Sequence, residues 1–470
     1  MSRISWTGVG MLAAAAALLA LALVWRLSRE ADRQISALPP ATLRDTGGPL
    51  TLAAVGDSVI DGPLPAAGAD RGFDQVAALL HRASAAMTNL EEELGPTGEA
   101  HPPDAWPAGA ADVAFDLRRL GITIVTRANN HGADRGADGI LSTGAALDRA
   151  GLRHAGAGRD LDAAREPAVL GDRPRRIAVI AVATSVDDEA RATRTRGDIV
   201  GRAGVSSIRT HTDITADPAT YAALLSMAQA THTGSESGSG LQLSGRLIRK
   251  GDRTSVEITA DREDLDDVLD RVRRAHADAD VVVVSLHSHE PGNLSVAPAA
   301  FVRAFARQAI DSGASLVVGH GPRQLRGIEV YGRGVILYSL GNFIFDRAAI
   351  PQNGADVYDA NTDLDALALD AVGRSGPPVL PAYDEAVWWE SVVATATFGD
   401  RGVVRVDLTP IDLGTERPRG GRGRPRPASA ERAAEILGRL AEQSKEHGTR
   451  IRIENGVGEV DIGTPAAAGS

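Results

Sequence analysis

The chain has no cysteine, few aromatic residues and no excess of positive charge. The absence of cysteine among 470 residues excludes disulfides and thiolate metal sites. Aromatic residues make up only 4% of the chain, so the abundant glycine and alanine must fill much of the core. The formal net charge of −11 argues against non-specific binding to nucleic acid. With 43% hydrophobic and 24% charged residues, the composition predicts a globular protein of two ordinary domains or one large α/β domain.

A long uncharged segment lies near the N-terminus. No residue from Ile4 to Trp25 is charged, and about 20 apolar residues are enough to cross the hydrocarbon of a bilayer. The alternative is a signal peptide cleaved near Ala20-Leu21-Ala22, but the apolar run continues beyond that point. We expect residues 1–26 to be a retained single-pass membrane anchor and 27–48 a tether. The main domain is then expected to lie outside the cytoplasmic membrane.

Beyond the tether, apolar runs alternate with amphipathic helical patterns. The runs LTLAAVGDS, ITIVT, RIAVIAVAT, ADVVVVSLHSHE and ASLVVGHG are typical of parallel strands covered on both faces. Helical patterns occupy 73–83, 140–151, 264–276 and 298–313. This alternation predicts an α/β layered fold, and the alternating segments 390–398 and 402–413 predict an antiparallel hairpin.

Two polar segments interrupt this pattern. The segment at about 186–262 is polar and rich in glycine and serine, and we interpret it as an insertion or loop region. Residues of about 350–385 predict a long surface excursion, so the main domain would span 49–412 with two insertions. The remainder, 413–470, contains five closely spaced arginines in a solvated linker, then a closing helix and a tail.

Polar side chains repeatedly follow the apolar runs. They are Asp57, Glu91 with its neighbours Glu92 and Glu93, the pair Asn130 and His131, His287 with His289 and Glu290, and His320. Ligands of open α/β sheets bind where the strands end, so these side chains predict one shared polar site. Carboxylate, amide and imidazole ligands together suit Zn, Mn or Fe. A single such residue would more simply be a turn or core residue, and the residues alone leave open whether a metal binds.

Several motifs together resemble one protein family. GDSVIDG, NLEEEL, TRANNHGADRG, HSHE, GHGPRQ and YSLGNF occur in the order seen in the CapA family of poly-gamma-glutamate capsule synthesis proteins, and the resemblance covers roughly 50–460. It implies a four-layer αββα sandwich like that of the calcineurin-like metallophosphatases, preceded here by one transmembrane helix. It also implies a cell-surface role in making or exporting an anionic polyglutamate capsule.

The resemblance further implies roles for individual residues. Asp57 would ligate a first metal ion and Glu91 would bridge two ions, while Asn130, His287 and His320 would complete the second metal site. His131 would act as general acid on the leaving oxygen.

The chain departs from the family pattern at three points. Ser58 and Val59 follow Asp57, so the usual Asp-x-His imidazole is absent, and Arg323 stands where many relatives carry the last histidine of Gly-His-x-Pro-His. A guanidinium has no lone pair for a metal. We therefore expect one divalent ion (Mn, Fe or Zn) rather than two, with Arg323 as a second positive charge that grips phosphate or carboxylate. Gly132 follows His131 where phosphatases often carry an orienting acid, which weakens His131 as the acid.

These features support one leading function and two alternatives. The leading hypothesis is an anchored, extracytoplasmic CapA-type protein that acts in polyglutamate capsule synthesis or export through a metallophosphatase-like site. The sequence leaves open whether that site is hydrolytic. The alternatives are a non-catalytic scaffold that binds an anionic polymer, and a general metal-dependent phosphodiesterase or phosphatase. Expected partners are the anionic polymer or a phosphate ester, the membrane, and membrane proteins of capsule synthesis, but not nucleic acid.

Overall fold

The computed structural model describes residues 36–60, 62–95, 108–346, 386–400, 402–414 and 423–463. The expected membrane anchor, the expected excursion at 350–385 and most of the arginine-rich linker lie outside these residues. Within the described part of the chain, no helix combines the length and the apolar character needed to cross a bilayer.

The first large sheet is built around β1 (Leu50–Val59). On one side of β1, the parallel strands are β2 (Ala85–Leu90), β3 (Ile124–Thr126) and β4 (Arg153–Ala155). On the other side, the antiparallel strands are β19 (Glu390–Gly399), β20 (Gly402–Asp412), β23 (Val457–Val460) and β22 (Ile451–Glu454). Two short strands join this sheet, β18 (Asn342–Phe345) beside β1 and β21 (Arg426–Pro427) beside β20. The predicted hairpin of β19 and β20 is confirmed.

The second large sheet has six strands, four of which run parallel. In spatial order they are β16 (Leu325–Tyr331), β17 (Gly334–Leu340), β15 (Leu316–His320), β14 (Val281–His287), β7 (Ile177–Ala183) and β6 (Ala168–Leu170). The apolar runs predicted as parallel strands form β7, β14 and β15 in parallel register, as expected. Strands β5 (Ala157–Gly158) and β8 (Gly204–Val205) make a separate short pair.

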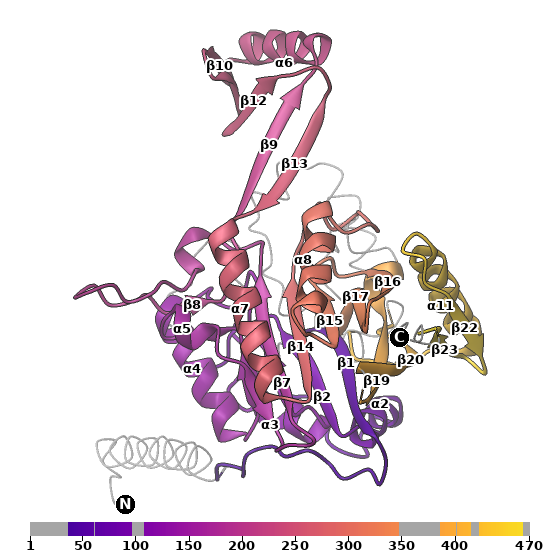
Figure 1. Ribbon diagram of the computed structural model, residues 1–470. Coiled ribbons are helices and arrows are strands. Elements are labelled where there is room, and N and C mark those ends of the chain that lie inside the picture. The colour runs from indigo at the N-terminus through magenta and orange to yellow at the C-terminus, as the bar shows by residue number, and fades with distance from the viewer. Residues whose placement is uncertain are drawn as a thin grey trace, which may run out of the picture.

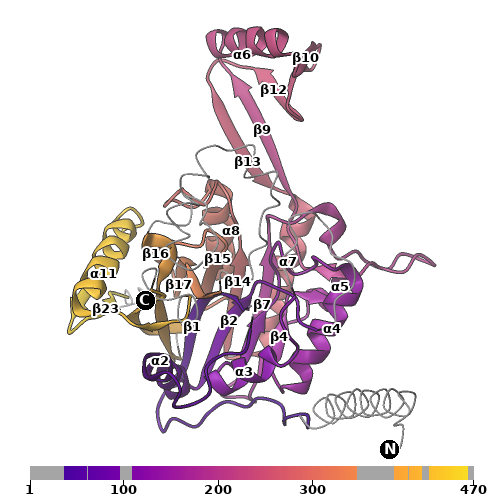
Figure 2. The same cartoon turned by 180° about the vertical axis from the view of Figure 1, so that it is seen from behind.

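The two large sheets pack face to face, and helices cover their outer faces (Figures 1 and 2). Along β1, Leu52 and Ala54 face the core between the sheets, whereas Ala53 and Val55 face helices. The helices on this first outer face are α2 (Arg71–Arg82), α3 (Val113–Leu120) and α4 (Gly136–Arg149). Those on the second are α7 (Arg262–Asp278) and α8 (Ala300–Asp311). Burial on both faces explains why the strands are continuously apolar.

Two further helices complete the described body. The short α5 (Leu161–Ala164) follows β5, and α11 (Ala430–Lys445) contacts β16 and β20 at one end of the molecule. Its Ile436, Leu437 and Leu440 join the core between the sheets. This is the closing helix that the sequence predicts within 413–470. Its N-cap is Ser429, whose side chain accepts a hydrogen bond from the backbone of Arg432.

A folded arm occupies much of the segment interpreted from its composition as an insertion or loop region. It projects away from the two large sheets (Figures 1 and 2). Its five-stranded sheet contains β10 (Gly234–Ser237), β11 (Gly240–Leu243), β12 (Arg246–Lys250), β9 (Thr210–Ala216) and β13 (Ser255–Ala260) in that order. Helix α6 (Pro218–Thr231) packs on this sheet through Tyr221 and Ala228. Gly238 with Ser239, and Ser244 with Gly245, form the tight turns that join β10, β11 and β12, and the composition alone did not distinguish this arm from a loop.

Candidate metal site

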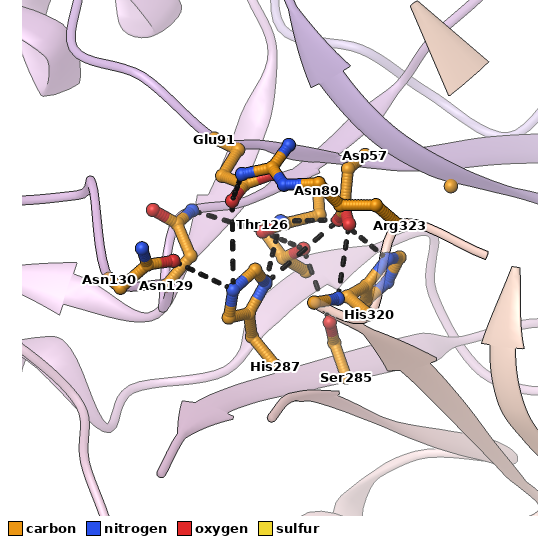
Figure 3. Close-up of polar contacts among 12 residues, drawn as sticks. Asp57, Asn89, Glu91, Thr126, Asn129, Asn130, Ser285, His287, His320 and Arg323 are labelled. Atoms are coloured by element: carbon orange, nitrogen blue, oxygen red, sulfur yellow. Dashed lines mark hydrogen bonds and ion pairs between the residues drawn. The ribbon is translucent and has the colours of Figure 1, made fainter. Parts of the chain in front are cut away.

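The ends of parallel strands bring the predicted site residues together. Asp57 near the end of β1 is in register with Asn89 of β2, and His287 at the end of β14 is in register with His320 at the end of β15. All four side chains are buried and lie in one polar cluster between the sheets (Figure 3). Parallel strands end at the same edge of a sheet, and the two facing sheets bring their edges together at this point.

Four donor atoms converge in this cluster, which we call the donor cluster: Glu91 Oε1, Asn130 Oδ1, His287 Nε2 and His289 Nε2. His287 Nε2 lies 2.9 Å from Asn130 Oδ1, 3.1 Å from His289 Nε2 and 3.8 Å from Glu91 Oε1. His289 Nε2 lies 3.2 Å from Asn130 Oδ1. Glu91 and His287 are fully buried, whereas Asn130 and His289 are partly exposed, so one side of the cluster faces solvent.

The donor cluster fits a divalent metal ion. Donors bound about 2.0–2.2 Å from one ion lie about 3–3.6 Å from each other, close to the distances observed. The second oxygen of Glu91, Oε2, is buried without a hydrogen-bond partner among the described residues. Burial lowers the pKa of His287 well below its usual value and that of His289 to about 4, so both imidazoles are neutral, the form that binds metal. One carboxylate, one amide and two imidazoles suit Mn, Fe or Zn.

His320 lies beside Asp57 and outside the donor cluster. Its Nδ1 is 3.1 Å from Asp57 Oδ1, and its Nε2 is buried with no hydrogen-bond partner among the described residues. Asp57 Oδ2 accepts the backbone N–H of Gly321 at 3.0 Å. Although burial alone would raise the pKa of Asp57, the hydrogen bond and charge of His320 hold it below its usual range, with help from the charges of His287 and Arg323. The sequence predicts His320 as a ligand together with Glu91, Asn130 and His287, and that assignment stays a prediction. In this structure His289 Nε2 lies with those three donors, whereas His320 lies against Asp57.

Arg323 places a positive charge against the donor cluster. Its guanidinium donates to Glu91 Oε1 at 2.6 Å, and both side chains are buried. Burial raises the pKa of Glu91 well above its usual value, and the Arg323 charge opposes that rise. The backbone of Arg323 has a φ of +61°, which is costly for a non-glycine residue. Asn342 donates to the Arg323 carbonyl at 3.3 Å and so helps to hold this conformation.

The Asn-Asn-His stretch after β3 supplies both a donor and an acid–base pair. Asn129 ties the turn down, since its amide donates to the carbonyl of Leu90 at 2.8 Å and its Oδ1 accepts the backbone N–H of His131 at 3.0 Å. His131 Nδ1 lies 3.0 Å from Asp134 Oδ2, and both are nearly buried. The orienting acid that seemed absent at Gly132 is therefore supplied two residues later. The charge of His131 is one of the smaller causes of the lowered pKa of His289, after burial and the charge of Arg323.

His289 and Glu290, both expected in the shared polar site, lie in different positions. His289 Nδ1 lies 2.7 Å from Asn293 Oδ1, so its Nε2 is directed to the donor cluster. Glu290 is held away from it, because its Oε2 accepts hydrogen bonds from three hydroxyl groups, those of Thr184, Ser185 and Ser288.

Three site residues were missed in the sequence. Asn89 donates to Asp57 at 2.8 Å. It stands two positions before Glu91, and since residues two apart on a strand share a face, this spacing could have identified it. Asp134 and Asn293 lie in loops, where the sequence holds no periodic signal. Arg127, just before the two asparagines, is structural, because it is buried and donates to the carbonyl of Ile140 at 2.6 Å.

The protein is of the α/β class, with two facing sheets covered by helices. At the strand ends it carries a candidate metal site of carboxylate, amide and imidazole donors. The family model described as bacterial capsule synthesis protein PGA_cap matches residues 51–347, and the chain belongs to this family.

Several relatives share substantial sequence with the chain. It is 35% identical over 433 residues to an uncharacterized protein, y4sH, of Sinorhizobium fredii, which covers 88% of this chain and 93% of the relative. It is 30% identical over 224 residues to a probable polyglutamine synthesis accessory protein of Mycobacterium tuberculosis (47% and 45%). It is 35% identical over 119 residues to capsule biosynthesis protein CapA of Bacillus anthracis (23% and 27%).

Proposed function

We propose that this protein acts in the synthesis or export of a polyglutamate capsule, outside the cytoplasmic membrane and anchored by its N-terminal segment, as a single-metal member of the metallophosphatase-like class. The layered arrangement of two sheets and outer helices supports this class. The convergence of Glu91, Asn130, His287 and His289 is the observation that carries the proposal. The capsule assignment is supported by the family and by the printed names of the relatives.

Each residue of the site has a distinct chemical role in this proposal. A divalent ion held by the donor cluster supplies Lewis acidity. Arg323, already against Glu91 and without a lone pair of its own, stabilises the negative charge of a phosphate or carboxylate. His131, oriented through its Nδ1 by Asp134, holds a proton at Nε2 and delivers it to the leaving oxygen. The partly exposed edge at Asn130 and His289 is where the substrate enters.

One ion fits these residues better than two. Asp57 is paired with His320 and with the amide of Asn89, and the remaining contact of Glu91 Oε1 goes to the Arg323 guanidinium. The positive charge that a second ion would bring is thus supplied by Arg323. The same observation favours a second candidate, a scaffold that binds the end of an anionic polymer without cleaving it.

The two candidates are separated by metal content and turnover. The full chain, purified without chelator, is expected to hold about one equivalent of Mn, Fe or Zn by elemental analysis, and His287→Ala and His289→Ala are expected to abolish both binding and ester hydrolysis. Full complementation of a capsule-deficient strain by these two variants would support the scaffold and reject the enzyme. A wild-type chain that binds none of the three metals would reject the metal site itself.

A further inference from the structure

The arm has a fixed position relative to the candidate site. Arg209, directly before β9, donates from its backbone and side chain to Asp264 of α7 at 3.0 and 2.7 Å. Its guanidinium also reaches Asp261, directly after β13, at 3.0 Å, and the backbone of Asp261 donates to the Arg209 carbonyl at 2.8 Å. Both inner strand ends are therefore fastened to the first turn of α7. The base of the arm is therefore held to the body by hydrogen bonds and ion pairs.

One face of the arm is only half covered. Side chains of β9 and β13 lie in register on that face, where Ile214 is opposite Val256 and Thr212 is opposite Ile258. Helix α6 packs over the outer part of the sheet, against Leu241 and other apolar residues. The part nearer the body is left open, and the Val256 side chain is 63% exposed. Val256 lies opposite the half-buried Ile214 and on the same strand face as the half-buried Ile258, so the open part is a small contiguous apolar strip.

This open face ends at Glu290 of the body, the residue that follows His289. The side chains of Thr212, Val256, Ile258 and Arg246 line a hollow of about 590 Å³ whose wall on the body side is Glu290. That volume is within the roughly 300–1,000 Å³ typical of ligand sites. Glu290 directly follows His289, so the hollow begins one residue from the donor cluster. The three hydroxyl donors to Glu290 Oε2 hold that carboxylate in place.

We propose that this hollow binds an extended stretch of a polyamide chain that carries carboxylates, and so leads the capsular polymer to the metal site. The inference rests on the proposed function and names the substrate of its site. Arg246 is exposed and makes no ion pair among the described residues, so it is available to a ligand carboxylate. Val256 and Ile258 contact the methylene groups of the ligand. The hydroxyl of Thr212 and the carboxylate of Glu290 accept its amide N–H groups.

The test measures binding of a fluorescent oligomer of about ten γ-linked glutamates to the full chain by anisotropy. Arg246→Glu and Val256→Ser are the test variants. Arg253→Glu is the matched control, because Arg253 is an exposed arginine of the same arm that does not line the hollow. Arg246→Glu is expected to weaken binding at least about tenfold, and Arg253→Glu less than about twofold. An oligomer of neutral glutamine is expected not to compete.

Three outcomes would overturn the inference: no oligoglutamate binding by the wild type, equal loss in both arginine variants, or equal competition by the glutamine oligomer. Unchanged thermal unfolding of Arg246→Glu and Val256→Ser shows that a loss of binding is not a loss of folding. The test separates this inference from the metal function. A chain that binds the oligomer through Arg246 but holds no metal rejects only the metal site, whereas a metal-binding chain that ignores the oligomer rejects only the hollow.

Discussion

Asn293 determines how His289 faces the donor cluster, and its removal should weaken metal binding. Asn293 Oδ1 lies 2.7 Å from His289 Nδ1, a distance that places the imidazole proton on Nδ1 and leaves the Nε2 lone pair for a metal. The Asn293 backbone is itself held, since its carbonyl accepts a hydrogen bond from Gln324. Arg326 fixes the same loop through the carbonyls of Glu290, Gly292 and Ser295, each at 3.0 Å.

The expected size of the effect follows from this geometry. In Asn293→Ala the imidazole loses its oriented acceptor, so the ring can turn and can carry its proton on Nε2. Loss of such an outer partner typically lowers metal affinity by about 10–100-fold, or about 1.4–2.7 kcal/mol. The apo protein should lose only about 1 kcal/mol of folding stability, because one partly exposed hydrogen bond is removed.

The measurement is titration of Mn²⁺ or Zn²⁺ into chelator-treated full chain by calorimetry. Asn293→Asp keeps an acceptor at the same position and is expected to retain most of the affinity. Leu294→Ala truncates the adjacent side chain, which is 77% exposed, and is expected to bind like the wild type. Wild-type affinity in Asn293→Ala, or an equal loss in Leu294→Ala, would show that Asn293 does not position the ligand.

Three other changes have defined outcomes. Arg323→Met removes the ion-pair partner of the buried Glu91 and should destabilise the metal-free protein by about 3–5 kcal/mol in denaturant unfolding. The loss should be smaller in saturating metal, because the ion would also neutralise Glu91. Equal losses in both conditions would contradict this role of the ion. Asp134→Asn should lower kcat for ester hydrolysis by about 10²-fold or more with metal content unchanged, and a parallel loss of metal would assign Asp134 a structural role instead. Trp389→Ala, at a fully buried contact with Phe345, should reduce stability by about 3–5 kcal/mol, and an unchanged unfolding midpoint would contradict its packing role.

The sequence predicted the body of the fold well, because both outer faces of the sheets are covered. Burial on both sides makes β7, β14 and β15 continuous apolar runs, which no surface loop would show. The arm was interpreted as an insertion or loop region, because its strands are mostly exposed. Its strand β9 contains Thr210, His211, Thr212 and Asp213 with little burial, so the hydrophobic periodicity that indicates a strand is weak.

The same distinction applies to the candidate site. Residues at strand ends, such as Asp57 and His287, could be found in the sequence, because the strand fixes where its last side chain lies. The approach of His289 to the donor cluster could not be predicted. It depends on the path of the chain after β14, where the loop clamped by Arg326 turns His289 back over the strand that carries His287.

The departures from the family pattern act together on the charge of the site. With no imidazole after Asp57, His320 is left to pair with that carboxylate, and Arg323 supplies to Glu91 the charge that a second ion would bring. In the proposed single-ion site, His289 would be the fourth donor beside Glu91, Asn130 and His287. Arg323→His should therefore not create a two-ion site, because Asp57 is already paired with His320 and with the amide of Asn89. Arg323→His is accordingly expected to bind one equivalent of metal by elemental analysis, and two equivalents would show that Arg323 alone excludes the second ion.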